Sequence, residues 1–405
     1  MTNHKYLIII SVLLLSACSS THTLQKRVTH DNYKAATIAA EPVNNLDNSD
    51  LDKSDLDKKS QQEPFRFWSD QQFDFLFSDD GKSTSLKVNG DRLNILALSG
   101  GGANGSFGAG IVNGLNDSGQ LGDYTIITGI SAGSLIAPFV FVGGDEIPRL
   151  KEVILGLNDK MVLGKRNFLN ALIKDALTDG VSMFEFIEQV YPPEMIEQIA
   201  EQHRAGRRLL IGTSHFDSEQ LVIWNVGQIA ASKLPNKVYL IHQILAASSS
   251  IPGVFPPQFI QVNYNGKQYE ELHVDGGITA QVFFQPGNLD YNKLNKALGL
   301  SKKPLVHVIR NGRLKVPYDS TPDKGVALLS RSLTSMVVQQ TRGDLYRMLY
   351  LSEVADLDLS FTYVDDSFET KKKSKDMFEL EYMQALYKYG YNKAVQELIW
   401  KKEMP

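Results

Sequence analysis

The pentapeptide Gly129-Ile130-Ser131-Ala132-Gly133 carries the strongest structural signal in this 405-residue chain. Apolar residues 124–128 before it predict a short buried strand, and apolar residues 134–139 after it predict the start of a helix. A serine between two glycines at such a junction lies on a sharp turn, and its hydroxyl projects beside the N-terminus of the helix. Gly-x-Ser-x-Gly is common in loops, so it is the strand–turn–helix setting that makes Ser131 a candidate nucleophile.

A second glycine-rich stretch, Ser99-Gly100-Gly101-Gly102-Ala103-Asn104-Gly105, lies upstream. Residues 93–98 predict a buried strand that runs into it, and a helix is expected to follow through Leu115. Successive glycines let the backbone aim several N–H groups at one point. Such a loop can stabilise an oxyanion or hold a phosphate, and the simpler alternative is a tight turn without a ligand.

The same glycines match the dinucleotide fingerprint Gly-x-Gly-x-x-Gly at residues 100–105. A Rossmann site needs an acidic residue at the end of the second strand, about 20 residues further on. Here the second strand ends at Ser131, and the nearest acid, Asp123, precedes that strand. A P-loop would need Lys-Ser or Lys-Thr after the glycines, which this stretch lacks. The pattern therefore argues against nucleotide binding.

A third motif, Asp275-Gly276-Gly277, follows a predicted hairpin. Strands expected at residues 259–263 and 268–271 flank Asn265-Gly266, a strong signal for a type I′ turn. Taken alone, an aspartate at such a place is most often a turn or capping residue. Asp275 gains weight as a catalytic candidate from the two motifs that precede it.

In this order the three motifs resemble those of the patatin-like phospholipase family, and residues 246–257 (AASSSIPGVFPP) are similar to a segment that the family carries shortly before its aspartate. The resemblance covers roughly residues 90–310. It implies a three-layer α/β/α fold with a mainly parallel central sheet, Ser131 as the nucleophile and Asp275 as its base. It also implies an oxyanion hole from the N–H groups of Gly100, Gly101 and Gly102. The turns would be shaped by the motif glycines Gly105, Gly129, Gly133, Gly276 and Gly277.

One position departs from the family, which usually carries Arg or Lys where this chain has Asn104. The backbone donors remain, so we expect catalysis with a weaker positive potential at the oxyanion. The ordinary pKa of an aspartate is about 3.9, far below that of a serine hydroxyl. A direct Ser–Asp dyad therefore requires burial that makes the carboxylate more basic.

The alternative is a Ser–His–Asp triad, in which the histidine of an α/β-hydrolase follows the aspartate along the chain. His307 is the sole histidine after Asp275, and it lies mid-strand in an apolar run, where a core role is expected. His273 is expected at most to support the dyad from outside. His203 and His215 are expected to be solvated.

The N-terminus resembles a bacterial lipoprotein signal. A basic start is followed by a ten-residue apolar run, residues 6–15, which is too short to span a bilayer comfortably. Leu15-Ser16-Ala17-Cys18 then resembles a lipobox. We expect a signal peptide at residues 1–17, lipidation of Cys18 and, from Ser19, sorting to a Gram-negative outer membrane. An ordinary cleaved signal peptide is the alternative, and Cys18 is the only cysteine of the chain, which excludes an intrachain disulfide.

The rest of the chain divides by composition. Residues 18–63 are polar, repeat Ser-Asp-Leu-Asp-Lys, and predict a disordered tether. A patatin-like catalytic domain is expected over residues 64–310, with its core from about residue 90, followed at 311–405 by a mostly helical extension packed on the same domain. Periodicity predicts helices at residues 167–177, 193–203, 324–355 and 377–400 and a strand at 357–364.

These observations predict a serine acyl hydrolase that cleaves lipid carboxylic esters, as a lipase, a phospholipase A or a lysophospholipase does, and that is anchored to the membrane through Cys18. Two alternatives stay open: a lipid acyltransferase, and a non-catalytic envelope lipoprotein that uses the fold for binding. The net charge of −4 and the lack of a recognition motif argue against nucleic-acid binding. No metal-binding motif or cofactor motif is present, and the sequence leaves the oligomeric state open.

Overall fold

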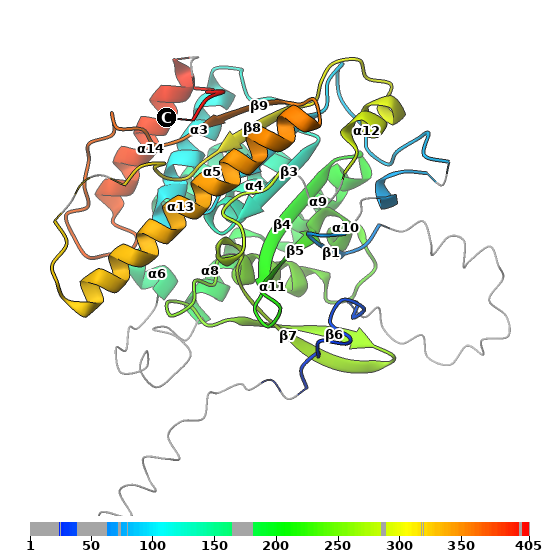
Figure 1. The fold of residues 1–405 in the computed structure, drawn as a ribbon, viewed down its shortest axis with the longest axis horizontal. Coiled ribbons are helices and arrows are strands. Elements are labelled where there is room, and N and C mark those ends of the chain that lie inside the picture. The colour runs from blue at the N-terminus through cyan, green and yellow to red at the C-terminus, as the bar shows by residue number, and fades with distance from the viewer. Residues whose placement is uncertain are drawn as a thin grey trace, which may run out of the picture.

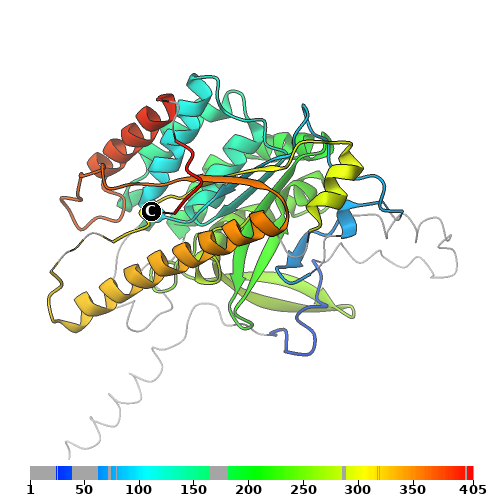
Figure 2. The same cartoon turned by 45° about the horizontal axis from the view of Figure 1, so that its top comes forward.

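The computed structural model describes residues 24, 26–38, 63–71, 74–78, 80–163, 181–284, 289–316, 318, 320–396 and 399–404. In these ranges the chain forms a nine-stranded mixed sheet with helices on both faces (Figures 1 and 2), which confirms the expected fold class. The expected signal peptide, Cys18 and the helix expected at 167–177 lie outside the described residues. Within the described ranges no helix has the length and apolarity needed to cross a membrane.

The sheet has a parallel half and an antiparallel half. The strand order is β1-β5-β4-β3-β2-β8-β9, and the run from β4 to β9 is parallel. β5 and β1 continue antiparallel beyond β4, and the hairpin β6–β7 pairs with the end of β4. The strands are β1 (Arg66–Trp68), β2 (Asn94–Leu98), β3 (Ile126–Ile130), β4 (Arg208–His215), β5 (Gln220–Asn225), β6 (Gln258–Tyr264), β7 (Lys267–Asp275), β8 (Leu305–Ile309) and β9 (Asp358–Thr362).

Alternation along the strands divides the core between the two faces of the sheet. On β2, Leu96 and Leu98 belong to one apolar cluster, and Ile95 and Ala97 belong to the other. Burying a leucine or isoleucine side chain contributes about 1.5–3 kcal/mol, so both faces need helical cover. The first face is covered by α3 (Gly105–Asp117), α4 (Ala132–Val142), α5 (Glu146–Gly156), α6 (Asp159–Leu163), α8 (Val181–Val190), α9 (Pro193–Arg204), α10 (Val226–Ala231), α11 (Lys237–Ser248) and α14 (Leu380–Val395). The second face is covered by α12 (Tyr291–Leu298) and α13 (Gly325–Val354).

The C-terminal part of the chain is integrated into this fold. α3 (cyan) and α14 (red) lie side by side in Figure 1, with glycines where their backbones meet. A Cβ on Gly114 would lie 2.6 Å from the carbonyl oxygen of Tyr391, so the close approach requires glycine there. The strand expected at 357–364 is β9, which extends the central sheet beside β8. The part expected to be a mostly helical extension therefore also supplies a strand of the central sheet.

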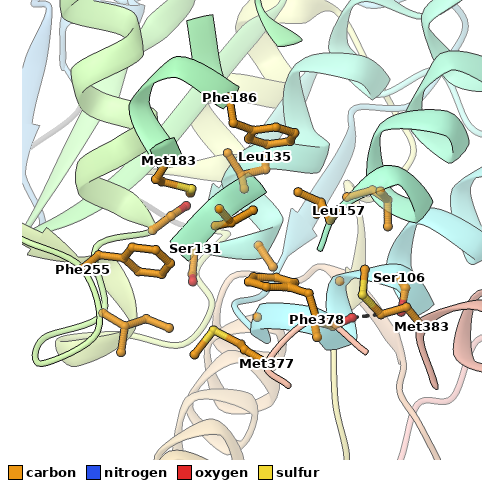
Figure 3. A pocket seen from close by; sticks show the side chains of 18 residues that line it. Ser106, Ser131, Leu135, Leu157, Met183, Phe186, Phe255, Met377, Phe378 and Met383 are labelled. Carbon is orange, nitrogen blue, oxygen red and sulfur yellow. Dashed lines mark hydrogen bonds between the residues drawn. The ribbon is translucent and has the colours of Figure 1, made fainter. Parts of the chain in front are cut away.

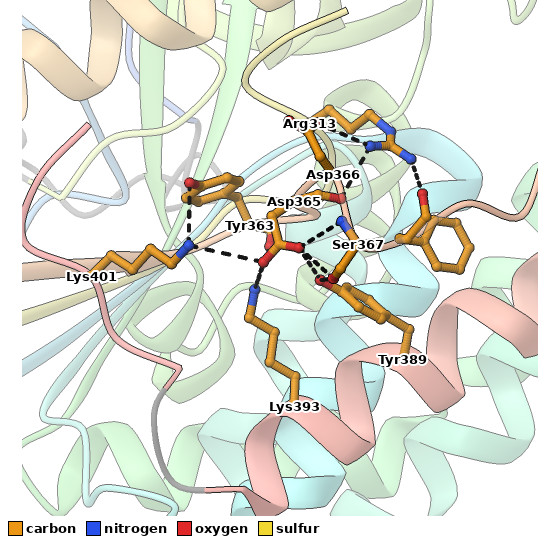
Figure 4. A network of polar contacts seen from close by, with 9 residues as sticks. Arg313, Tyr363, Asp365, Asp366, Ser367, Tyr389, Lys393 and Lys401 are labelled. Carbon is orange, nitrogen blue, oxygen red and sulfur yellow. Dashed lines mark hydrogen bonds and ion pairs between the residues drawn. The ribbon is translucent and has the colours of Figure 1, made fainter. Parts of the chain in front are cut away.

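A polar network fixes α14 against the end of β9 (Figure 4). The carboxylate of Asp365 accepts hydrogen bonds from Lys393 Nζ at 2.7 Å, Tyr389 OH at 2.8 Å and Ser367 Oγ at 2.6 Å. Burial would raise the pKa of Asp365, but these hydrogen bonds and the nearby Lys393 charge hold the pKa well below its ordinary value. The C-terminal half of α14 is therefore held against the central sheet.

Residues 26–38 correct the tether prediction, because they pack on the β6–β7 hairpin. Val28 and Ala36 form a small apolar cluster with Val262, and Thr37 exchanges two backbone hydrogen bonds with Asn263, of 2.9 and 2.7 Å. Arg66 Nη2 also donates to the carbonyl oxygen of Ala36 at 2.8 Å. The expectation of disorder is wrong for this segment, since its few apolar side chains find a surface that the segment alone does not provide.

Candidate active site

Ser131 occupies a strained turn between β3 and α4. Its backbone angles are φ 52° and ψ −123°, in a region that residues with a side chain rarely adopt. The flanking glycines permit the turn: a Cβ on Gly129 would lie 2.6 Å from the carbonyl oxygen of Gly133, and a Cβ on Gly133 would overlap that of Leu98. The turn predicted from the pentapeptide is therefore present, with the hydroxyl at the start of α4.

The sheet register brings Asp275 to Ser131. Ile130 of β3 pairs with Gly212 of β4, and the next residue of β4, Thr213, pairs with Asp275 at the end of β7. Ser131 Oγ donates a hydrogen bond of 2.7 Å to Asp275 Oδ2. The other carboxylate oxygen, Oδ1, accepts the N–H of Gly277 at 2.7 Å, so the side chain is fixed at both oxygens.

Burial changes the chemistry of this carboxylate. Asp275 is 5% exposed, and burial raises its pKa to about 6, against the lowering effect of its hydrogen bonds from Ser131 and Gly277. At neutral pH the group is ionised, yet it is a stronger base than an ordinary aspartate. This is the condition that a direct Ser–Asp dyad requires.

The side chain of Ser248 supports the strained turn by a hydrogen bond with the backbone of Ser131. The N–H of Ser131 donates to Ser248 Oγ at 3.0 Å, and Ser248 Oγ donates onward to the carbonyl oxygen of Gly212 at 2.8 Å. This role did not emerge from the sequence, although residues 246–257 were recognised as similar to a family segment. Ser248 is the residue of that segment whose side chain contacts the backbone of Ser131.

The glycine loop lies against the nucleophile, but its N–H groups differ in availability. The N–H of Gly100 donates to the carbonyl oxygen of Gln281 at 3.0 Å, so it is already engaged. The N–H groups of Gly101 and Gly102 have no hydrogen-bond partner within the part of the chain that the structure describes. Ala132, which opens α4, has an N–H without an acceptor inside its own helix. The expected set of donors is thus shifted from Gly100 toward Gly101, Gly102 and Ala132.

A buried arginine contacts the backbone of this glycine loop. Arg310 is 3% exposed, and its Nη1 donates to the carbonyl oxygen of Gly100 at 2.9 Å. Burial lowers the pKa of Arg310 to about 10, so the guanidinium stays charged at neutral pH. The carbonyl of Gly100 and the N–H of Gly101 belong to one peptide group, so this hydrogen bond polarises the N–H.

Asn104, the position where the family usually carries a cation, makes a different contact. Its Oδ1 accepts a hydrogen bond of 2.9 Å from Tyr382 OH of α14. The glycine loop is thereby tied to the C-terminal part of the chain, which the sequence did not connect to the site.

A hollow opens at Ser131, and its lining is almost entirely apolar (Figure 3). Met183 and Phe186 of α8 line one part, and Met377, Phe378 and Met383, at and before the start of α14, line another. Asp159 holds this last wall, because its carboxylate accepts the N–H groups of Met377 at 3.1 Å and Phe378 at 2.7 Å. The pocket has the apolar lining expected for a hydrocarbon chain.

Within the described ranges no histidine completes a triad with Ser131 and Asp275. His307 is half-buried, not fully in the core as expected, with Nδ1 2.8 Å from Tyr124 OH and its ring stacked on Trp400 at 3.9 Å. His273 contacts Glu271 at 3.1 Å and Thr213 at 2.9 Å, and neither partner is Ser131.

The expectation of solvated His203 and His215 is wrong, since the two rings are 8% and 1% exposed. Tyr33 of the packed N-terminal segment stacks on His215 at 5.8 Å. His203 Nε2 lies 2.8 Å from Gln228 Oε1 on α10. Burial lowers the pKa of both histidines to about 4, so both are neutral at physiological pH.

Comparison with known proteins agrees with this geometry. The family model described as patatin-like phospholipase matches residues 96–286, whereas none of the curated proteins matches the chain. Among solved structures, VipD from Legionella pneumophila is 15% identical with a TM-score of 0.36, covering 79% of this chain and 68% of its own. The type III effector protein ExoU is 12% identical with a TM-score of 0.34, at 77% and 54% coverage. Human GIVD cytosolic phospholipase A2 is 13% identical with a TM-score of 0.34, at 76% and 58% coverage.

The chain thus spans between about half and two thirds of the lengths of these three proteins. The likeness to them is distant, so the assignment rests on the family match. That match covers the glycine loop, the Ser131 turn and Asp275 together. Residues 96–286 therefore match a patatin-like phospholipase domain, the domain of a family of lipid carboxylic ester hydrolases.

Proposed function

We propose that this protein hydrolyses lipid carboxylic esters through a Ser131–Asp275 dyad and an acyl-enzyme. The observation that carries the proposal is the 2.7 Å hydrogen bond from Ser131 Oγ to Asp275 Oδ2 at an apolar pocket. The raised pKa of Asp275 supports it, because a buried carboxylate is a better acceptor for the serine proton.

In the first step Asp275 takes the proton of Ser131 as Oγ bonds to the ester carbonyl carbon. The tetrahedral intermediate then loses its alkoxy group, which takes the proton from Asp275. Water repeats the sequence on the acyl-enzyme: Asp275 accepts a proton from water, the hydroxide attacks, and Ser131 leaves with that proton while the fatty acid is released. Atoms and protons balance, and Asp275 returns to its starting state.

The negative charge on the carbonyl oxygen needs donors that are fixed before the reaction. We assign this role to the N–H groups of Gly101, Gly102 and Ala132, and we assign Gly100 a structural part in the loop. Arg310 strengthens the Gly101 N–H through the shared peptide group. A single donor of this kind contributes on the order of 10²–10³-fold in rate.

The pocket favours an acyl chain over a polar ligand, because side chains such as Leu135, Phe186 and Phe378 line it. We therefore infer a lipase, phospholipase A or lysophospholipase activity, with the acyl chain in this hollow and the rest of the lipid outside.

The test uses the full-length chain in mild detergent, an alkyl-fluorophosphonate probe and esters of graded acyl length. Ser131→Ala should abolish labelling, and both Ser131→Ala and Asp275→Asn should lower hydrolysis by about 10³-fold or more. Faster product formation with added alcohol, as an acyl ester, would instead indicate an acyltransferase. A folded wild type that neither hydrolyses esters nor binds the probe covalently would contradict the proposal and favour a non-catalytic binding module.

We further propose that Cys18 is lipidated and anchors the protein to a bacterial outer membrane. The lipobox-like sequence before Cys18 supports this proposal. Mass spectrometry of the N-terminal peptide and membrane fractionation would test it, with Cys18→Ala as the variant that should lose both the added mass and the membrane association. Recovery of unmodified Cys18 in a soluble fraction would contradict the proposal.

A further inference from the structure

Three serines supply the polar side chains among the described residues that line the pocket. Ser131 donates to Asp275, and Ser106 Oγ donates to the carbonyl oxygen of Ala103 at 2.9 Å. Ser249 differs from both, because its Oγ is buried and has no hydrogen-bond partner within the described residues. The residue itself is 5% exposed. The hydroxyl of Ser249 therefore has unused hydrogen-bonding capacity in the wall of the pocket.

The neighbours of Ser249 show that its unpaired state is specific to this position. Ser248 Oγ donates to Gly212, and Ser250 Oγ donates to the carbonyl oxygen of Ala246 at 2.8 Å. A buried hydroxyl without a partner costs about 1–3 kcal/mol. Buried polar groups are rarely left unpaired in folded proteins, so an unpaired hydroxyl in a pocket indicates a partner supplied by a ligand.

We propose that Ser249 donates a hydrogen bond to the alkoxy oxygen of the bound ester, the oxygen that leaves with the alcohol. This rests on the proposed ester hydrolysis by Ser131. An ester has acceptors but no donors, so the serine hydroxyl is the donor in any contact with it. The carbonyl oxygen faces the N–H groups of Gly101, Gly102 and Ala132 in our assignment, which leaves the alkoxy oxygen for Ser249.

The contact acts at the step in which the first product departs. When the bond between the former carbonyl carbon and the alkoxy oxygen breaks, its electron pair moves onto that oxygen and Asp275 delivers the proton. The hydrogen bond from Ser249 strengthens as negative charge builds there, so it favours the transition state over the bound ester. For one hydrogen bond of this kind we expect about a tenfold effect on kcat/KM.

The leaving group makes the proposal testable. A fatty acyl alkyl ester has a basic alkoxide leaving group, whose departure depends on stabilisation of the negative charge. A p-nitrophenyl ester of the same acyl chain has a weakly basic leaving group, whose departure needs little such stabilisation. Ser249→Ala in the full-length chain should lower kcat/KM about tenfold for the alkyl ester and by less than about twofold for the p-nitrophenyl ester. Ser250→Ala is the matched control, and it should keep the wild-type ratio between the two esters.

Stability gives a second readout, because Ser249→Ala removes no side-chain hydrogen bond among the described residues and should leave the Tm unchanged or slightly higher. Equal losses on the two esters, an alkyl-ester rate within twofold of wild type, or a clearly lowered Tm would each overturn the role of Ser249. Hydrolysis by the wild type that disappears in Ser131→Ala shows separately that the dyad works. A wild type inert toward both esters would overturn the hydrolase proposal and, with it, this one.

Discussion

Asp275→Asn should make the protein less active and, above pH 6, more stable. The folded protein binds a proton on Asp275 more tightly than the unfolded chain does, because burial raises the pKa from 3.8 to about 6. Asp275 therefore stabilises the fold fully below pH 3.8, and this contribution is lost as the pH rises to about 6. Asparagine stays neutral at every pH, so its contribution to the stability of the fold does not change with pH.

The size of the effect follows from the two pKa values. A difference of about two pKa units corresponds to about 3 kcal/mol at 1.36 kcal/mol per unit. The unfolding free energy of Asp275→Asn minus that of wild type should therefore grow by up to about 3 kcal/mol between pH 4 and pH 8. Any fixed difference, such as an altered contact with Ser131 Oγ, cancels in this comparison across pH.

Urea unfolding at pH 4, 5, 6, 7 and 8 measures this directly, with Asp323→Asn, at an exposed carboxylate, as the matched control for the exchange itself. The control should follow wild type across the series. If the difference in unfolding free energy between Asp275→Asn and wild type stays constant from pH 4 to pH 8, the argument that burial makes Asp275 a stronger base is refuted.

Three further outcomes are expected. The kcat/KM of the wild type should rise with pH and level off above about 6, as Asp275 loses its proton, and a profile flat from pH 5 to 8 would contradict its role as base. Phe378→Ala should shift the preferred acyl chain to greater length in a graded ester series, because it removes a side chain from the pocket wall; an unchanged profile would exclude that wall from chain selection. Arg66→Met should lower the unfolding free energy by about 3–5 kcal/mol in urea titrations, because the buried carboxylate of Glu271 loses its arginine partner and keeps only the contact with His273; Arg66→Met with Glu271→Gln should recover part of the loss.

Local chemistry made much of the site predictable. The Ser131 turn, the glycine loop and the Asn265-Gly266 hairpin turn depend on backbone conformations that only certain residues adopt, so the letters alone identify them. Asn265 and Gly266 have φ of 49° and 72°, as a type I′ turn requires. The resemblance of these motifs, in their order, to the patatin-like phospholipase family then implied that Ser131 and Asp275 come together.

What escaped prediction depends on contacts between distant parts of the chain. The engagement of Gly100 by Gln281 and the buried Arg310 behind the loop join segments far apart in sequence. His215 was expected in solvent because nothing near it in sequence covers it, whereas Tyr33 does so from the N-terminal segment. The unpaired hydroxyl of Ser249 is visible only once all neighbours of the pocket are placed.

The packing of residues 26–38 on the β6–β7 hairpin changes how far an anchored enzyme can travel. From Cys18 to Lys26 there are eight residue steps, which extend at most about 3.6 Å each, or about 29 Å in total. A free tether through residue 63 would have a contour of about 160 Å by the same rule. With Cys18 held in a lipid layer, Lys26 would stay within about 29 Å of that layer. The domain packed on this segment would then have little freedom to turn over. If Cys18 is lipidated as proposed, such an enzyme would meet its substrates by lateral diffusion in the membrane that holds it.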